Sequence, residues 1–392
     1  MSIWLLTLAA YFCVVMLYSA AILDTEYDRR ISWIAFIVIS AIWFYSFENV
    51  AGDFCQFYIA AKIPLHSLYN FSRYATFGKA LLVFDHVLKT YAPYLRPPAF
   101  APLLRPLGWF SYWHAFLIWQ AAAFVSYVLA LRLLFRRFNL PHQLLPAFAL
   151  FFPALFNMSI GQDINTYLLV LLAGLLCLLD GKDSLAGVLI ALCTYKFHLI
   201  LLIVVALIAH RRWKALGAFG AVSSFLVAVS VALVPPDEYI HELMAVPPFF
   251  GLIPNSIRGV LLQSNHANWY VPIALVGVTL CIYLIWRLPL QQGLAVAIVG
   301  VLLFGHYGTW PDTTLLAVPI AIMWRNAGPV ARKLLLAILV FPPAWMAGEL
   351  SFRVLAEGFL LFYVAYSAWR DGKEPIAVPA VAQAAQAGAL TC

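Results

Sequence analysis

One carboxylate in this sequence, Asp53, stands at a position that suits acid–base chemistry. It belongs to the run Gly52-Asp53-Phe54-Cys55-Gln56-Phe57-Tyr58, where an apolar stretch gives way to a long external segment. A carboxyl group held against an apolar wall has a raised pKa and can take a proton from an alcohol. The same pattern is typical of an aspartate that caps a helix by accepting backbone N–H bonds. The spacing leaves both interpretations open.

Four more polar segments are predicted to lie on the same face as Asp53. Arginine can hold a phosphate through two N–H bonds, so their cations favour a phosphate-bearing ligand at this face. An interfacial helix whose Lys and Arg side chains reach lipid headgroups explains some of these cations equally well. The segments are 94–98 with Arg96, 157–165 with Gln162 and Asn165, 235–268 with Asn255 and Arg258, and 305–312 with His306 and Asp312.

The elements that carry these residues are predicted to cross a membrane. Of the 392 residues, 64% are hydrophobic and 10% are charged, whereas a soluble domain has about 25% charged residues. This composition excludes a soluble enzyme, a disordered chain and a nucleic-acid-binding module. The net charge of +7 first reflects the cytoplasmic bias of Lys and Arg in membrane proteins, so it identifies no partner. The six cysteines show neither metal-ligand spacing nor a disulfide framework.

Roughly eleven apolar runs approach the ~20 residues that a membrane-crossing helix needs. We therefore expect an all-α polytopic membrane protein with one domain, 1–370, an outside N-terminus and a retained first helix. Residues 49–106 form the predicted external loop, with short juxtamembrane helices on the outer leaflet. The tail 371–392 is predicted to be disordered and cytoplasmic. The predicted spans are 3–23, 32–48, 107–131, 143–158, 164–179, 215–234, 270–286, 290–305, 313–324, 334–348 and 350–368.

The apolar run from Leu185 to Ala209 differs because positive charges flank both of its ends. Lys182 precedes it and 210–214 follows, so both ends are predicted on the cytoplasmic side. Its centre holds Thr194-Tyr195-Lys196-Phe197-His198, and a charge at mid-membrane needs a cavity or a partner. We predict a re-entrant helical hairpin with Lys196 near its apex. One long tilted span with a structural lysine is the alternative.

Several short motifs follow one another along the chain. They are Gly52-Asp53-Phe54 with Tyr58 and Ala60-Ala61, Arg96-Pro97-Pro98, Gly161-Gln162-Asp163-Ile164-Asn165, and Ala186-Gly187 followed by Lys196-Phe197-His198. Their order, over about residues 50–325, resembles glycosyltransferase family 87 of the GT-C superfamily. That family uses polyprenol-phosphate sugars and includes mannosyltransferases of mycobacterial phosphatidylinositol mannosides. The sequence has Arg96-Pro97-Pro98 where the family has Tyr-Pro-Pro, and Lys196-Phe197 where it has Lys-Pro. These departures concern the acceptor and the sugar more than the reaction class.

The resemblance implies a GT-C-like fold and a role for each polar residue. A hexose, expected to be mannose, would pass with inversion from a polyprenyl-phosphate sugar to a glycolipid or glycan acceptor. Asp53 would be the general base, at the outer face of the inner (plasma) membrane. The scheme requires no metal or other cofactor. Arg96, Lys196, Arg258 and His306 would bind the donor phosphate, whose charge grows during the reaction. Sugar or acceptor contacts would come from Tyr58, Gln162, Asn165, His198, Asn255 and Asp312, with Gln162 and Asn165 alternatively supporting Asp53.

Other functions remain open on the sequence alone. The same architecture would serve a transferase of lipid-linked arabinofuranose or glucose, because the choice of sugar depends on the shape of the pocket. A lipid or solute transporter would use Lys196 and the half-helices as a midplane site. Against a transporter, the sequence shows no internal repeat and its polar residues gather on one face. A non-catalytic scaffold for cell-envelope glycans would tolerate loss of the Asp53 carboxylate.

Overall fold

The structure is a computed structural model of the chain, and it describes residues 53–70, 73, 76, 78, 94–149, 151–245, 256–306, 308–340 and 350–371. Within these ranges every regular element is an α-helix or a 3-10 helix, in agreement with the predicted all-α class. The predicted spans 3–23 and 32–48, the tail from residue 372 onward and Asn255 lie outside the described residues.

The described helices vary widely in length, and most of them coincide with a predicted apolar run. The first half of the chain contributes α3 (Phe54–Lys62), η1 (Leu65–Ser67), η2 (Pro98–Trp109), α5 (Tyr112–Phe138), η3 (His142–Leu144), α6 (Leu145–Ala149), α7 (Phe152–Ile160), α8 (Ile164–Leu179), α9 (Asp183–Leu192) and η4 (Cys193–Leu199). The second half contributes α10 (Leu201–Ala209), α11 (Trp213–Leu233), α12 (Pro236–Ala245), α13 (Ile257–Gln263), η6 (Ala267–Trp269), α14 (Tyr270–Arg287), α15 (Leu290–Phe304), η7 (Trp310–Leu316), α16 (Ala317–Trp324), α17 (Pro329–Val340) and α19 (Leu350–Asp371).

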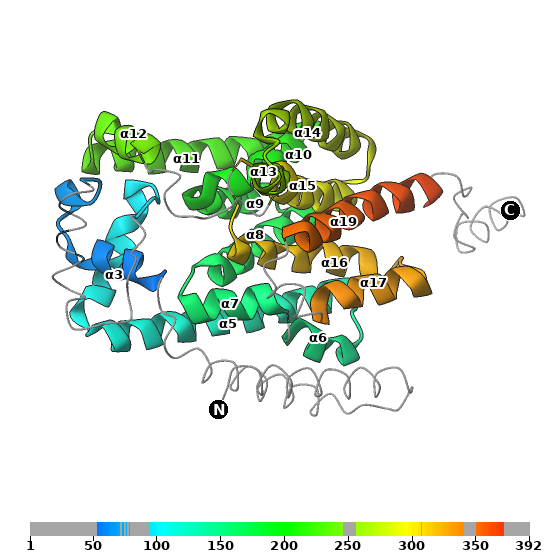
Figure 1. Ribbon diagram of the computed structural model, residues 1–392, viewed down its shortest axis with the longest axis horizontal. Helices are drawn as coiled ribbons and strands as arrows, with labels where there is room; N and C mark the ends of the chain where they lie inside the picture. The colour runs from blue at the N-terminus through cyan, green and yellow to red at the C-terminus, as the bar shows by residue number, and fades with distance from the viewer. Residues whose placement is uncertain are drawn as a thin grey trace, which may run out of the picture.

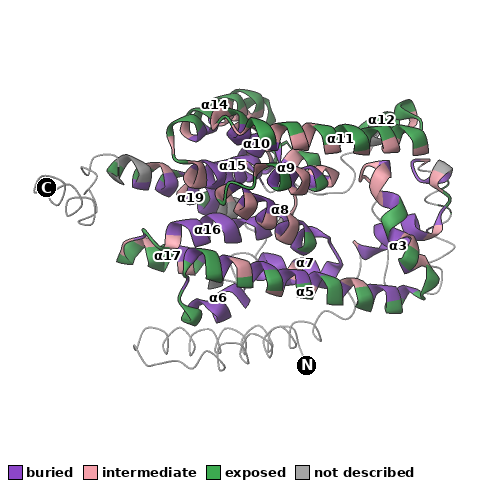
Figure 2. Ribbon diagram, turned by 180° about the vertical axis from the view of Figure 1, so that it is seen from behind, coloured by how far each residue is buried: buried purple, intermediate pink, exposed green. Residues whose placement is uncertain are grey.

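Three helical segments of the described chain are long and apolar enough to cross a membrane. They are α5, α11 and the segment Ala267–Arg287 that joins η6 to α14. The bent pair His142–Ala149 and Phe152–Ile160 is a fourth candidate, and several shorter apolar helices, α8 and α15 among them, lie beside these. Figure 2 shows exposed residues along the outward faces of α11 and α14. The protein is therefore an all-α membrane protein, and the total of about eleven crossings stays a prediction.

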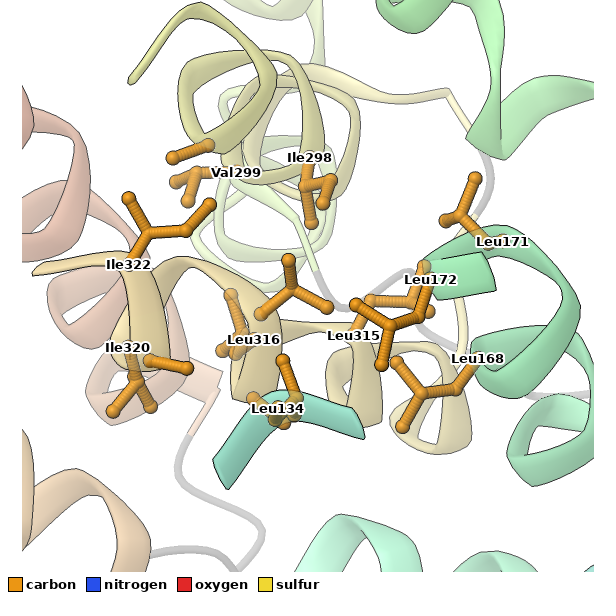
Figure 3. Packing of buried hydrophobic residues seen from close by; sticks show 14 of the residues in the cluster. Leu134, Leu168, Leu171, Leu172, Ile298, Val299, Leu315, Leu316, Ile320 and Ile322 are labelled. Atoms are coloured by element: carbon orange, nitrogen blue, oxygen red, sulfur yellow. The ribbon is translucent and has the colours of Figure 1, made fainter. Parts of the chain in front are cut away.

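The main hydrophobic core lies where α5, α8, α15 and α16 meet, and it encloses η7. In Figure 3, Leu315 and Leu316 of η7 are surrounded by Leu134 of α5, Leu168 of α8 and Ile298 of α15. All five of these side chains are completely or almost completely buried. This close packing fixes η7, and the first turn of η7 carries Asp312.

A second buried cluster surrounds α3, and it corrects one expectation. Residues Phe54 to Ala61 are all buried, because η2 and the start of α5 cover the helix. Arg105 of η2 ties the two elements together by donating a hydrogen bond to the Ala61 carbonyl at 3.2 Å. The expectation that the helix after Asp53 lies on the outer leaflet is therefore wrong for α3, which packs against protein on every side.

Helices α9 and α10 form a hairpin joined by η4. Asp183 at the start of α9 and Arg212, just beyond the end of α10, form an ion pair at 3.4 Å. Both ends of the segment thus lie together, and the backbone leaves helical geometry at Lys196, with φ −122° and ψ 63°. The segment is therefore a helical hairpin and not one continuous helix, and its re-entry into the membrane stays a prediction.

The helices give the molecule two distinct ends. Figure 1 shows α3 and α12 at one end, and α17 with the last turns of α19 at the other. Helix α8 begins after Asp163, near α3, and ends before Asp180. The apex of the α9–α10 hairpin returns to the end that holds α3, because Lys196 contacts Asp163.

Candidate active site

Asp53 immediately precedes α3, but its side chain does not cap that helix. Its backbone N–H donates to the Ile160 carbonyl at 3.0 Å, which joins the start of α3 to the end of α7. The Gln162 amide donates from Nε2 to Asp53 Oδ2 at 2.8 Å. Among the described residues no donor reaches the other oxygen, Oδ1. The described chain therefore holds the carboxylate through one oxygen only.

The turn that presents Gln162 depends on Gly161. This glycine ends α7 with φ +77°, and a Cβ there would lie 2.5 Å from Phe54 Cβ. Only glycine adopts this conformation at little cost, and only glycine lets α3 approach so closely. From α5, Trp119 Nε1 donates to the Gly161 carbonyl at 2.9 Å and Gln120 Nε2 donates to the Met158 carbonyl at 3.2 Å. Local geometry and α5 together thus place Gln162 beside Asp53.

Arg96 connects Gln162 to Asp163. Its Nη2 donates to Gln162 Oε1 at 3.4 Å and to Asp163 Oδ1 at 3.2 Å, and its Nε donates to Asp163 Oδ2 at 3.0 Å. The Arg96–Asp163 pair is thus bidentate, which is the strong and directional form of this interaction. The guanidinium also lies over the rings of Phe57 and Tyr195, at 5.9 and 6.0 Å.

Lys196, at the apex of the hairpin, is shared by two carboxylates. Its Nζ lies 3.1 Å from Asp163 Oδ1 and 2.8 Å from Asp312 Oδ1. Asp312 Oδ2 in turn accepts hydrogen bonds from the backbone N–H and the hydroxyl of Thr309, at 2.7 and 2.9 Å. We call the continuous chain Asp53, Gln162, Arg96, Asp163, Lys196 and Asp312 the ion network.

The ion network holds three carboxylates and two cations, and most of it is shielded from solvent. Lys196 is 3% exposed, Asp312 1% and Asp163 5%. Burial raises the pKa of the Asp53 carboxyl above its usual value, against the opposing effects of Gln162, Lys196 and Arg96. Burial also acts to raise the pKa of Asp163, but Arg96 and Lys196 outweigh it and hold that pKa below its usual value. The network thus places an ionised aspartate, Asp163, near one with increased basicity, Asp53.

A second cluster forms where α13 meets the end of α15. Arg258 Nη1 donates to the His306 carbonyl at 3.0 Å, and its guanidinium lies 6.0 Å from the Tyr270 ring centroid. The rings of Tyr270 and His306 are 5.8 Å apart, and the Tyr270 hydroxyl donates to the Phe304 carbonyl at 3.0 Å. Unlike Arg96 and Lys196, Arg258 is bonded here to a backbone carbonyl and not to a carboxylate.

In the described ranges, no three His, Cys, Asp or Glu side chains are arranged to hold a metal ion. The described cysteines are free thiols. The expectation that the reaction needs no metal stays a prediction.

The sequence model of glycosyltransferase family 87 matches residues 94–319. The chain belongs to this family. It is therefore a glycosyltransferase. This membership favours the enzyme hypothesis over the transporter and scaffold hypotheses. No curated protein matches the chain.

The segment that matches glycosyltransferase family 87 includes Arg96, Gln162, Asp163, Lys196 and Asp312. It also includes Arg258, Tyr270 and His306. Asp53 precedes the matched segment and is joined to it by the hydrogen bond from Gln162.

The structure brings together five of the residues predicted to act in this glycosyltransferase: Asp53, Arg96, Gln162, Lys196 and Asp312. It places Arg258 and His306 together in the second cluster. His198 lies two residues after Lys196 with its ring edge-on to Phe197, at a centroid distance of 5.9 Å.

Two residues predicted to contact sugar or acceptor are instead part of the buried framework. Tyr58 donates its hydroxyl to the Phe110 carbonyl at 2.9 Å and packs edge-on against Tyr112. Asn165 is fully buried and donates to the Ala154 carbonyl at 3.3 Å, which joins α8 to α7. These contacts favour a packing role for both side chains.

Three residues belong to the site although they were not predicted from the sequence: Asp163, Thr309 and Tyr195. Asp163 lies in a motif that was identified, but an aspartate just before an apolar helix is typical of a cap. Its side chain makes no such cap bond. Tyr195 donates its hydroxyl to the Asp163 carbonyl at 3.4 Å. A capping box, Thr309 with Asp312, was the one signal that could have identified Thr309.

Proposed function

We propose that this glycosyltransferase moves a hexose, mannose, from a polyprenyl-phosphate sugar to a hydroxyl of a glycolipid or glycan, with inversion. The observation that carries the proposal is the Asp53 carboxylate, which has a raised pKa, one oxygen held by Gln162 and no described donor on the other. A carboxylate of raised basicity is suited to accept a proton from an acceptor hydroxyl.

The proposed reaction is a single displacement. Asp53 Oδ1 takes the proton of the acceptor hydroxyl while that oxygen forms a bond to the anomeric carbon of the donor sugar. The bond from the anomeric carbon to the phosphate oxygen breaks, and its electron pair passes to the phosphate. Because attack and departure occur on opposite faces of the ring, the configuration of the anomeric carbon inverts.

The departing phosphate needs a cation to stabilise its growing charge. Lys196 and Arg96 already bind carboxylates in the ion network, so neither is free to hold the phosphate without giving up an ion pair. Arg258 and His306 are more accessible, and Arg258 has no carboxylate partner in the described chain. We therefore assign binding of the phosphate to Arg258 and His306. Arg96 and Lys196 have a supporting role in the ion network.

The proposed active site faces the outer side of the inner (plasma) membrane. Arg137 and Arg212 form ion pairs with Asp180 and Asp183, at the end of the bundle opposite α3. Clusters of Lys and Arg mark the cytoplasmic side of membrane proteins. The end with α3, and with it Asp53, is then the outer one, where lipid-linked donors and glycan acceptors meet.

The experiment is transfer of labelled mannose from polyprenyl-phosphate-mannose by the purified full-length protein, with a panel of glycolipid acceptors. Asp53→Asn should lower the rate by about 10²–10⁴-fold, the usual contribution of a general base. The matched control is Asp237→Asn, because Asp237 is an exposed aspartate in the first turn of α12, at the same end of the molecule. It should leave the rate unchanged.

Equal rates for the intact protein and Asp53→Asn would exclude Asp53 as the base. The anomeric configuration of the product, read by nuclear magnetic resonance, tests inversion: retention would exclude the single displacement. Transfer from lipid-linked glucose or arabinofuranose but not mannose would identify a different donor for the same architecture.

A further inference from the structure

The ion network joins four separate parts of the chain to the carboxylate proposed as base. Starting from Asp53, each residue contacts the next at 2.8–3.4 Å, through the α7–α8 turn, the segment before η2, the hairpin apex and η7. Asp163 is its central member, because it is the one residue that binds both cations. The question is what a fully buried carboxylate contributes at that point.

Stability alone is a weak reason for such an arrangement. Burying charged groups removes them from water, and apolar side chains of similar volume often give an equally stable or a more stable protein. Apolar side chains would fit these surroundings, because Tyr167 of α8 and the packed leucines of η7 lie next to the network. The buried ions cost desolvation energy and lie next to a proposed catalytic carboxylate. Their position therefore favours a role for them in the reaction.

The geometry shows how Asp163 acts on Asp53 without touching it. Both Asp163 oxygens bind Arg96, so the guanidinium plane is fixed. The fixed Nη2 donates to Gln162 Oε1, and this contact determines which end of the amide faces Asp53. With Oε1 toward Arg96, Nε2 must face the carboxylate. The orientation of Asp53 therefore depends on Asp163 through two intervening side chains.

Charge balance gives a second link. The charged groups that act on Asp53 are Arg96, Lys196 and Asp163, and behind Lys196 lies Asp312. The two cations match the two carboxylates Asp163 and Asp312. Without Asp163, one uncompensated positive charge would remain beside Asp53 and would weaken it as a base.

We propose that Asp163 is a positioning residue of the transfer reaction, which orients Asp53 through Arg96 and Gln162 and balances the two cations beside it. The inference rests on the proposed role of Asp53 as general base. It assigns the hairpin apex, through Lys196, to the same positioning system.

The test is the pH dependence of kcat/KM for Asp163→Asn and Lys196→Gln, with the full-length protein. The acid limb of this profile reports the base of the free enzyme. Asp163→Asn removes a negative charge, so the acid limb should move to lower pH. Lys196→Gln removes a positive charge, so the limb should move to higher pH. Each shift should be about half a pH unit or more, with kcat lowered at least about tenfold in both.

The opposite signs distinguish positioning from a merely structural role, which would lower activity in both variants without moving the limb. The matched control is Asp180→Asn, because Asp180 follows the other end of α8 and its side chain is exposed. The limb of Asp180→Asn should coincide with that of the intact protein. Shifts in the same direction, or none in either variant, would overturn the proposal.

Size-exclusion profiles show whether the two variants fold. Arg96→Lys keeps the charge but cannot form the bidentate pair. This variant tests the proposal if Asp163→Asn or Lys196→Gln does not fold. The proposal expects a lowered kcat with the acid limb in place, and an unchanged kcat would overturn it. Loss of activity in Asp53→Asn together with an unshifted limb in the other variants would overturn the positioning role and leave the proposed base intact. Full activity of Asp53→Asn would remove the base itself.

Discussion

The two ends of α8 carry ion pairs of nearly the same length in opposite surroundings. At one end Arg96 and Asp163 lie 3.0 Å apart and are almost fully buried, and at the other Arg137 and Asp180 lie 2.9 Å apart with about two fifths of each side chain exposed. An exposed pair contributes little, because water and salt screen it and two long side chains must be held still. A buried pair that loses one partner leaves an uncompensated charge. The two pairs therefore differ in burial and not in distance. We expect the buried pair near Asp53 to contribute far more than the exposed pair at the opposite end.

The largest effect is expected where the buried network is anchored, at Asp312. Asp312→Ala leaves Lys196 with one carboxylate and removes the acceptor for both Thr309 donors. Loss of one partner of a buried pair costs about 3–5 kcal/mol of folding free energy. We expect a lower midpoint of thermal unfolding in detergent and no measurable transfer. An unfolding midpoint equal to that of the intact protein would contradict the assignment of Asp312 as an anchor.

Two glycines near the ends of α8 give a matched pair for the backbone. Gly161 and Gly181 both have positive φ, 77° and 74°, but a Cβ at Gly161 would meet Phe54 while a Cβ at Gly181 would meet nothing within 4 Å. Gly161→Ala should therefore cost ~1–3 kcal/mol in strain and also displace Gln162 from Asp53. Gly181→Ala should lower stability by a smaller amount and leave kcat unchanged. Unfolding midpoints and kcat of both variants check this, and equal kcat values would count against the role of the turn.

The third prediction concerns Arg258, which has no carboxylate partner among the described residues. A hydrogen bond to a charged group contributes about 1.5–3 kcal/mol, so Arg258→Gln should lower kcat/KM by roughly 10–100-fold if this residue stabilises the departing phosphate. The matched control is Arg105→Gln, because Arg105 also donates to a backbone carbonyl, that of Ala61. It should lower kcat/KM much less. Equal losses in the two variants would mean that Arg258 only supports the backbone.

The positions of several apolar helices were predictable because each depends on a local property of the sequence. Helix α8 coincides with the predicted span 164–179, and α14 extends the predicted span by one residue. A charge within an apolar run between two basic flanks was enough to predict the hairpin with Lys196 near its apex.

The partners within the site were not predictable in the same way. Asp163 binds side chains 67 and 33 positions away, at Arg96 and Lys196, and these contacts exist because three helical segments converge. Tyr58 was predicted to contact sugar or acceptor because it lies in the Asp53 motif that resembles the family. Its hydroxyl instead binds a carbonyl 52 positions further along the chain, after η2 has folded over α3. Short motifs show which residues are polar, and the packing of the helices determines what they contact.

The smallest effect is expected at the exposed end of α8, and it completes the comparison. A double-mutant cycle of Arg137→Gln and Asp180→Asn should give a coupling energy of about 0.2–1 kcal/mol, decreasing as salt is added. The acid limb and kcat/KM should equal those of the intact protein, because this pair lies a full helix length from Asp53. The measurements are thermal unfolding at two salt concentrations and mannose transfer. A coupling energy as large as that of a buried pair, or a change in the pH profile, would contradict the conclusion that burial determines how much each pair contributes.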